Sequence, residues 1–183
     1  ISIFVAAFYI GAMVFQFPVG WLSDRMDRRI LIVATSAIGF IAAVFAIFGE
    51  NIFIILLGSA FFIGGMSNPL YSLLIAYTND FLEPDDMASA SGGLLFLNGL
   101  GAISGPLFTG YLMTEIGPTG FFVILAALLG LLTVYGFYRM TQRGISDVDT
   151  SSYATVLPTT SVVAVEIAQE LAIEAAEELD ESA

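Results

Sequence analysis

The sequence predicts an all-α membrane protein with five transmembrane helices and an acidic C-terminal tail. The first observation is compositional: 57% of the 183 residues are hydrophobic and 12% are charged, whereas soluble domains are about 25% charged. The second is that long stretches carry no charge at all, and each has 20 residues or more. About 20 apolar residues in a helix cross the bilayer core. The charge-free stretches are 1–23, 30–49, 51–79, 87–114 and 116–138.

The first two predicted helices enclose a basic loop. The first span covers about 1–22 and ends where the charged residues of loop 24–29 begin. The second span covers 30–48 and closes on the polar turn Gly49-Glu50-Asn51. Each charged cluster marks a point where the chain reaches water, because a charge at the bilayer centre costs several kcal/mol.

Three further spans follow, separated by an acidic loop and a short turn. We expect helices because an open strand would leave its backbone groups unpaired in lipid. A barrel strand would alternate in polarity, which these apolar runs do not. The remaining elements are the span 52–78, the acidic loop 79–86, the span 87–113, the turn at 115–118 and the span 121–138.

The placement of the five arginines predicts the orientation in the membrane. With alternating spans, the cluster in loop 25–29 and the pair Arg139 and Arg143 lie on one side. Basic loops are typically cytoplasmic. We therefore expect a multi-pass protein of the plasma or inner cell membrane with a cytoplasmic C-terminus. The turns at Glu50 and Glu115 then face outside.

The chain divides into a transmembrane domain, 1–143, and a tail, 144–183. The tail begins as a Ser/Thr-rich linker and holds 9 of the 17 acidic residues, so the net charge of −12 describes mainly this segment. Its composition favours a solvated, disordered segment. The spacing of its acidic residues also permits an amphipathic helix that docks on a partner, although like charges four apart oppose a helix. Those glutamates are Glu166, Glu170, Glu174 and Glu178.

Composition excludes several functional classes. The chain has no cysteine and no histidine, which removes thiol nucleophiles, the commonest general base and the commonest metal ligands. Five arginines without a lysine cannot form a nucleic-acid footprint. Catalysis would need paired ionisable groups at one depth in the membrane, and none is visible. We expect no enzyme activity, no cofactor and no metal.

The loop after the first span carries the sharpest motif. Gly20 would let another helix approach closely. Asp24 could accept hydrogen bonds from the N-terminus of a neighbouring helix, where the dipole favours an anion. The arginines could pair with acids in other loops, although basic residues in a short loop also serve simply to set topology. The motif reads Gly20-Trp21-Leu22-Ser23-Asp24-Arg25-Met26-Asp27-Arg28-Arg29.

A second motif lies in the fourth span. Gly101 and Gly105 form a small-xxx-small face that predicts close helix packing. Pro106 removes one backbone hydrogen bond and predicts a bend. A nucleotide-binding glycine loop is the competing interpretation, but no strand precedes the motif and the whole run is uncharged.

Together these motifs resemble the major facilitator superfamily. The first is similar to the family signature G-x-x-x-D-R-x-G-R-R, with Asp27 where glycine is usual. Aspartate tolerates the left-handed turn conformation better than most residues, so this departure weakens the match only slightly. The second motif is similar to the Gly-Pro motif of the fifth helix in each six-helix half, and its order along the chain fits. The resemblance implies a partial six-helix half-bundle over 1–143.

The stretches 77–80 and 90–95 resemble the C-terminal half of the YcaD-like bacterial subgroup. The five spans would then be helices 8–12, in a fragment that lacks the N-terminal half of the same polypeptide. An N-terminal half that ends after helix 6 stays open as the alternative. The chain begins with Ile1 rather than methionine, which is consistent with a fragment.

Polar residues and prolines inside the spans are candidates for the transport pathway. Lipid-facing polar groups are costly, so such residues tend to face a cavity or a neighbouring helix. The candidate cavity-lining residues are Gln16, Asn68, Tyr71 and Asn98. Three prolines predict bent helices, as in many transporters, at Pro18, Pro69 and Pro106.

The family resemblance implies a transporter that moves a small solute across the bilayer by alternating access. The loop of Gly20, Asp24, Arg25, Arg28 and Arg29 would gate it, latching the cytoplasmic ends of the first and fourth spans. No ionisable residue lies deep in a span, so the substrate and any coupling ion stay open. A non-transporting membrane scaffold or receptor-like protein is the alternative function.

Overall fold

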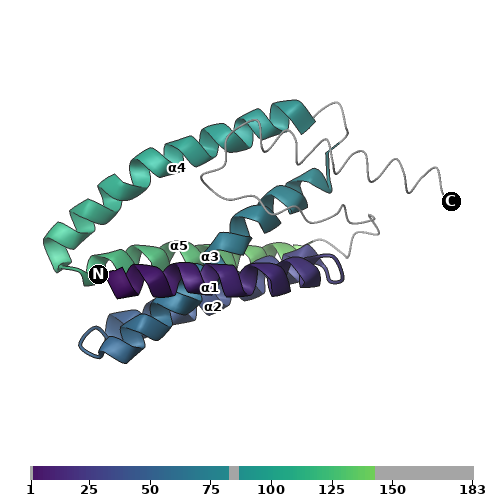
Figure 1. The fold of residues 1–183 in the computed structure, drawn as a ribbon. Coiled ribbons are helices and arrows are strands. Elements are labelled where there is room, and N and C mark those ends of the chain that lie inside the picture. Colours follow the sequence, from purple (N-terminus) through teal and green to yellow (C-terminus); the bar gives the residue numbers. More distant parts are fainter. Residues whose placement is uncertain (1, 83–86, 143–183) are drawn as a thin grey trace.

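The computed structural model describes residues 2–82 and 87–142, which form five α-helices (Figure 1). The predicted all-α fold is confirmed, and each helix is long and apolar enough to cross a membrane. At 1.5 Å per residue, even the shortest, with 21 residues, spans about 30 Å, the thickness of the hydrocarbon core. The helices are α1 (Ser2–Ser23), α2 (Arg28–Phe48), α3 (Phe53–Asn79), α4 (Met87–Ile116) and α5 (Thr119–Gln142). The predicted acidic tail lies outside the described residues.

Helix ends differ from the predicted spans by two to four residues where charges or turn residues decide them. Helix α2 begins at Arg28 because Asp27 caps it. Helix α4 continues to Ile116, and Gly117 follows it with a φ of 76°. Glycine adopts this left-handed conformation at little cost and commonly ends helices in this way. Helix α5 runs past residue 138 to Gln142, since the long side chain of an arginine can reach water from a helix end.

The packing order in space is α1, α3, α2, α5 and α4, so α3 and α2 form the centre. Two buried clusters hold α1, α2, α3 and α5 together. One lies near the start of α2 and includes Leu31, Leu73 and Leu129. The other lies near the end of α2 and includes Ala43, Ile63 and Phe122. Small alanines in the second cluster allow α2 to lie close to its neighbours.

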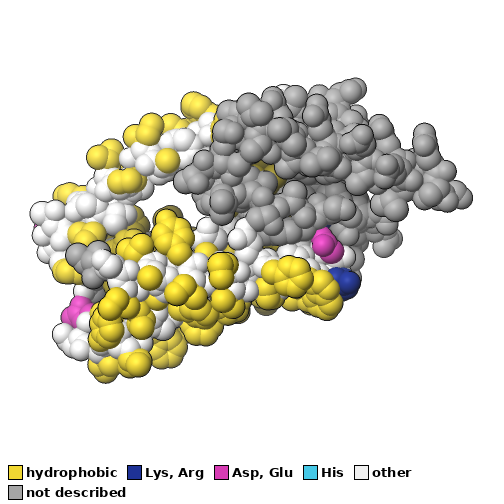
Figure 2. Space-filling view, in the orientation of Figure 1, with side chains coloured by type: hydrophobic (Ala, Val, Ile, Leu, Met, Phe, Trp, Pro, Cys, Tyr) yellow, Lys and Arg dark blue, Asp and Glu magenta, His cyan; other side chains and the backbone are white. Residues whose placement is uncertain are grey.

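The charged side chains lie at the two ends of the bundle, with an apolar surface between them (Figure 2). Large apolar side chains on the outside include Phe17 (79% exposed) and Leu131 (68% exposed). A soluble protein rarely exposes so large an apolar surface, whereas lipid solvates it. The surface therefore fits a protein that spans the membrane.

The arginines lie at one end of the bundle, and the turn at Glu50 lies at the other end. Arg29 on α2 and Arg139 on α5 line one cavity, so the two basic groups lie at the same end. We call this the arginine end: the ends of α1, α3 and α5 and the start of α2. At the opposite end, the hydroxyl of Thr119 donates a hydrogen bond to the carboxylate of Glu50.

Helices α1 and α3 approach each other through glycines that the sequence analysis did not single out. A Cβ atom added at Gly11 would collide with the backbone carbonyl of Phe61. One added at Gly64 would collide with the carbonyl of Phe8, and one at Gly65 with the ring of Phe15. These positions allow backbone-to-backbone contact between two membrane helices.

Helix α4 is set apart from the rest of the bundle. Figure 1 shows it as a curved helix that runs over the others and returns to α5 through a short turn. It packs chiefly against α5, and no residue in its apolar window, within Ser89–Ile116, is buried. One whole helix face therefore has no covering in the described part of the chain.

The close packing predicted at Gly101 and Gly105 has no partner among the described residues. A Cβ atom added at either glycine would meet nothing within 4 Å. The physical reason is the position of α4, which leaves this face open. Helices α1, α3 and α4 continue through Pro18, Pro69 and Pro106 without interruption.

Candidate functional site

The loop between α1 and α2 is organised by a helix cap. The carboxylate of Asp27 accepts a hydrogen bond from the backbone N–H of Arg29 at 2.9 Å, which satisfies one of the open donors at the start of α2. Asp27 has φ −55° and ψ 117°. Asp27 therefore does not adopt the left-handed conformation that a glycine would allow at this position, and its side chain caps the helix instead.

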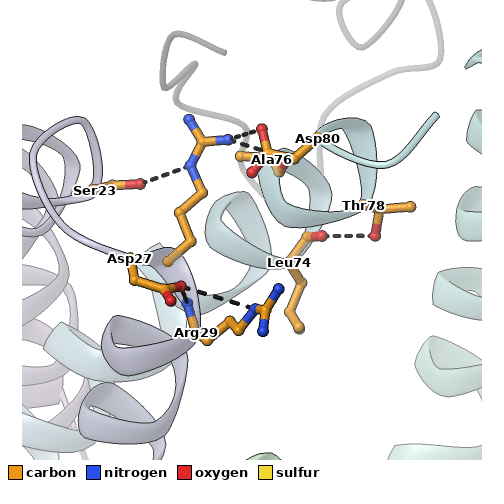
Figure 3. A network of polar contacts seen from close by, with 8 residues as sticks. Ser23, Asp27, Arg29, Leu74, Ala76, Thr78 and Asp80 are labelled. Carbon is orange, nitrogen blue, oxygen red and sulfur yellow. Dashed lines mark hydrogen bonds and ion pairs between the residues drawn. The ribbon is translucent and has the colours of Figure 1, made fainter. Parts of the chain in front are cut away.

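Arg28 is the centre of the site, and its side chain is almost completely buried. Its Nη1 atom lies 2.5 Å from Oδ1 of Asp80, and the two side chains are 1% and 8% exposed. Nη1 also donates to the carbonyl oxygen of Ala76 at 3.2 Å, and Nε donates to the hydroxyl of Ser23 at 3.3 Å (Figure 3). One guanidinium group thus joins the end of α1, the start of α2 and the end of α3.

This arrangement satisfies the physical requirements of a buried charge. A buried ion is tolerated when a counter-charge and further hydrogen bonds replace its water. Asp80 supplies the charge, while Ala76 and Ser23 supply acceptors whose positions are set by two helix ends. The expectation that a loop arginine pairs with an acid of another loop is confirmed for Arg28.

Arg25 is exposed in the loop, whereas Arg29 lies in the first turn of α2 with a side chain that is 10% exposed. The guanidinium of Arg25 lies 4.1 Å from the ring centre of Trp21 and donates to the Trp21 carbonyl oxygen at 3.2 Å. The guanidinium of Arg29 lies 5.9 Å from the ring centre of Tyr77. The Nε atom of Arg29 lies 4.0 Å from Oδ1 of Asp27. The exposed cation–π contact of Arg25 contributes little to stability.

The two remaining gating residues, Gly20 and Asp24, lie at the end of α1. Gly20 is buried on α1, and Asp24 is exposed just beyond the helix end. The hypothesis joins Asp24 to the start of α4. Residues 83–86 of the preceding loop lie outside the described residues, so the latch stays a prediction.

The candidate cavity residues are spread over three helices. Gln16, Asn68, Tyr71 and Asn98 are all half-buried. The side-chain amide of Asn68 donates to the carbonyl oxygen of Gly64 at 3.3 Å, within its own helix. Because α4 packs chiefly against α5, helix packing does not bring Asn98 against the residues of α1 and α3.

Sequence reasoning missed Asp80 as the partner of Arg28. Asp80 was visible as a charge at the end of the third span, and the alternation of spans places it at the same end as Arg28. What the sequence lacked was the packing of α3 against both α1 and α2. Ser23 gave no signal, because an isolated serine at a helix end is common.

Comparison with known proteins now decides the family. The chain matches the family model described as "Major Facilitator Superfamily" over residues 1–164. The chain belongs to the major facilitator superfamily. This match extends beyond the predicted domain boundary at residue 143. No solved structure matches the chain significantly.

Two curated relatives in this superfamily comparison carry transporter names. The chain is 35% identical over 136 residues to the "Uncharacterized MFS-type transporter YfkF" of Bacillus subtilis (strain 168), which covers 70% of the chain and 33% of that protein. It is 30% identical over 139 residues to the "Benzoate transport protein" of Acinetobacter baylyi, which covers 73% of the chain and 29% of that protein. The chain thus spans about a third of the relatives that it matches.

Proposed function

We propose that this chain forms the C-terminal half-bundle, helices 8–12, of a transporter that moves a small solute by alternating access. The observation that carries the proposal is the contrast between two parts of the bundle. The buried Arg28 network joins α1, α2 and α3 into one unit, while α4 presents an uncovered face. Alternating access is largely the rocking of one rigid bundle against another around a shared site. A rigid unit with one open face fits that mechanism.

The partner of the open face is the other half of the same polypeptide, and the lipid bilayer surrounds both. The substrate is a small molecule, and the name of the Acinetobacter relative makes benzoate a reasonable first probe. The cytoplasm lies at the arginine end, as the positive-inside rule requires. The protein is then a multi-pass protein of the cell membrane with its C-terminus inside.

Cysteine accessibility tests this proposal without knowledge of the substrate. The chain has no native cysteine, so Asn68→Cys in a cysteine-free complete polypeptide reports on one position. Under alternating access, a membrane-impermeant maleimide should label this site from either side of the membrane. Leu131→Cys, on the lipid-facing surface, is the control and should stay unlabelled. A scaffold protein would leave Asn68→Cys accessible from one side at most.

Asp24→Asn should weaken the latch at the arginine end. The neutral amide interacts less well with the N-terminus of a helix, a loss of about 0.3–1 kcal/mol at an exposed site. We therefore expect a two- to fivefold rise in maleimide labelling of Asn68→Cys from the arginine side. Glu115→Gln removes an exposed acid at the opposite end and should leave labelling unchanged. Equal labelling in Asp24→Asn and the parent protein would contradict the latch.

Gly101→Leu should impair the packing of α4 against the other half of the transporter without impairing the packing of the helices within this chain. Nothing lies within 4 Å of a Cβ atom at Gly101, and leucine is a better helix former than glycine, so the thermal stability of the isolated chain should not fall. In the complete polypeptide, the larger side chain would hold the two halves apart, and we expect benzoate uptake or two-sided labelling to fall at least about tenfold, a loss of about 1.4 kcal/mol. Gly58→Leu, on a face of α3 that is equally open, is the matched control.

A further inference from the structure

Helix α5 is held firmly against α2. A Cβ atom added at Gly136 would lie 2.7 Å from a methyl group of Val33, so the two helices lie very close at this level. Three positions away on each helix, the hydroxyl of Thr133 donates a hydrogen bond to the hydroxyl of Ser36 at 3.1 Å. Close packing through small residues and a hydrogen bond between helices both stabilise membrane bundles. Helix α5 is therefore a fixed support within the bundle.

Helix α4 is joined closely to this support at the turn between the two helices. A Cβ atom added at Gly120 would lie 2.7 Å from the carbonyl carbon of Leu112, so the backbones of α4 and α5 are in contact there. Gly117 turns the chain with a φ of 76°. The start of α5 is itself held in place, because the hydroxyl of Thr119 donates to the carboxylate of Glu50. This turn is a fixed point from which α4 extends.

Away from the turn, α4 is packed loosely within the described chain. Figure 1 shows it running apart from the other helices. No residue in its apolar window, within Ser89–Ile116, is buried, and a Cβ atom added at Gly99 or Gly110 would meet nothing within 4 Å. Hinge motions are concentrated in a few residues at the ends of elements. A helix held at one end in this way can rotate as a unit about the turn.

An apolar cavity lies between α2, α3 and α5 at the arginine end. It has a volume of about 80 Å³, it is partly open, and its accessible surface is almost wholly apolar. Its walls include Leu74 of α3 and Leu132 of α5. Atoms that line an unfilled cavity lack contacts on one side, so an apolar side chain that enters the cavity gains those contacts.

The turn determines which part of α4 can reach this cavity. The part of α5 that lines the cavity, 132–140, begins 12 positions and ends 20 positions after Gly120, which is about 18–30 Å along the helix. Leu95 lies 17 positions before Leu112, about 26 Å from the turn in the same direction. Leu95 is half-buried, whereas its neighbour Phe96 is 67% exposed. An apolar side chain on the inner side of α4 therefore stands at the level of the cavity.

We propose that α4 is a lid that rotates about its turn with α5 and closes on this cavity, with Leu95 against Leu74 and Leu132. The structure holds the lid in its open position. The exposed side of α4, which carries Phe96, stays available to the other half of the polypeptide when the lid closes. The proposal concerns packing within this chain, so it can fail while the transport function stands. Only the statement that closure narrows a transport path at the arginine end rests on the proposed function.

The apolar walls favour α4 over two other occupants. The acidic tail would bring carboxylates and polar backbone to the cavity, which is costly without hydrogen bonds. A lipid acyl chain would leave surroundings that are equally apolar and would gain little. Leu95 belongs to the same chain, so its effective concentration at the cavity is high.

Disulfide formation in the complete polypeptide tests the lid. The chain has no native cysteine, so Leu95→Cys with Leu74→Cys in an otherwise cysteine-free polypeptide reports on one pair in proteoliposomes. A disulfide requires Cα atoms within about 7 Å, so oxidation should link this pair at least about tenfold faster than Phe96→Cys with Leu74→Cys. The second pair is the matched control, because it differs by one position on α4. Equal rates for the two pairs would overturn the proposal.

Gly120→Ala tests the fixed point at the turn. The added methyl group would collide with the backbone of Leu112 and displace α4 from α5, so we expect linking of Leu95→Cys to Leu74→Cys to fall at least about fivefold. Gly110→Ala, at an open position of α4, is the matched control and should leave the rate unchanged. Equal rates in these two variants would show that α4 does not rotate about this turn.

Photo-crosslinking identifies the occupant of the cavity without a change at Leu74. Tyr77 lines the cavity from α3, and Tyr77→p-benzoyl-phenylalanine in the complete polypeptide should crosslink to a peptide of α4 on illumination. Mass spectrometry of the digested protein locates the product. A crosslink to the acidic tail alone, or to phospholipid alone, would assign the cavity to that occupant and overturn the proposal.

Discussion

Replacing Asp80 with alanine should lower the free energy of unfolding of the bundle by about 3–5 kcal/mol. The change removes the carboxylate that contacts Nη1 of Arg28, a side chain that is 1% exposed. Breaking a buried pair on one side leaves a charge without the partner that balanced its loss of water. Unfolding in detergent by a denaturing surfactant, followed by circular dichroism, measures the effect.

A double variant tests whether the stability lost in Asp80→Ala comes from the unpaired charge of Arg28. Arg28→Met combined with Asp80→Leu replaces both charges by apolar groups, and such exchanges are often neutral or stabilising. We expect the double variant to recover most of the stability lost in Asp80→Ala. Glu115→Ala, an exposed acid at the opposite end, controls for the change in net charge. A loss below about 1 kcal/mol in Asp80→Ala would show that the pair does not hold α2 against α3.

Gly64→Ala should destabilise the bundle by about 1–3 kcal/mol, the usual cost of overpacking. The added methyl group would collide with the backbone carbonyl of Phe8. A backbone atom cannot rotate aside as a side chain can, so α1 and α3 would have to separate. The same unfolding measurement in detergent reports the change.

Gly58→Ala is the matched control for this prediction, because it makes the same substitution on the same helix. Nothing lies within 4 Å of a Cβ atom at Gly58. Alanine is a better helix former than glycine by about 1 kcal/mol, so this variant should be unchanged or slightly more stable. Equal stability of the two variants would show that the close approach at Gly64 does not limit the packing of α1 and α3.

The number and place of the helices could be predicted from charge alone. Each of the five helices lies over one charge-free stretch, because an uncompensated charge is what a membrane span excludes. The ends were predicted less well, since they depend on local chemistry. Asp27 caps α2 through its side chain, and this decides a boundary that hydrophobicity alone places two residues later.

The site could be predicted only in part, for two physical reasons. The sequence shows that a loop arginine is charged, but the partner of that arginine depends on which helices pack together. Asp80 is the partner of Arg28 only because α3 lies beside α1 and α2. Glycine is ambiguous in the same way. Gly64 meets a backbone and Gly101 meets nothing in the described chain, yet both stand in similar apolar surroundings in the sequence.

The ion pair of Arg28 and Asp80 also implies an order of events during synthesis. The two residues are 52 positions apart, so at 5–20 residues per second Arg28 leaves the ribosome about 3–10 s before its partner. During that interval its charge is uncompensated and counts fully toward the topology of the first helices. Once α3 has inserted, the same charge is neutralised and buried. Arg28 thus adds to the charge of the loop while α1 and α2 insert, and it holds three helix ends together afterwards.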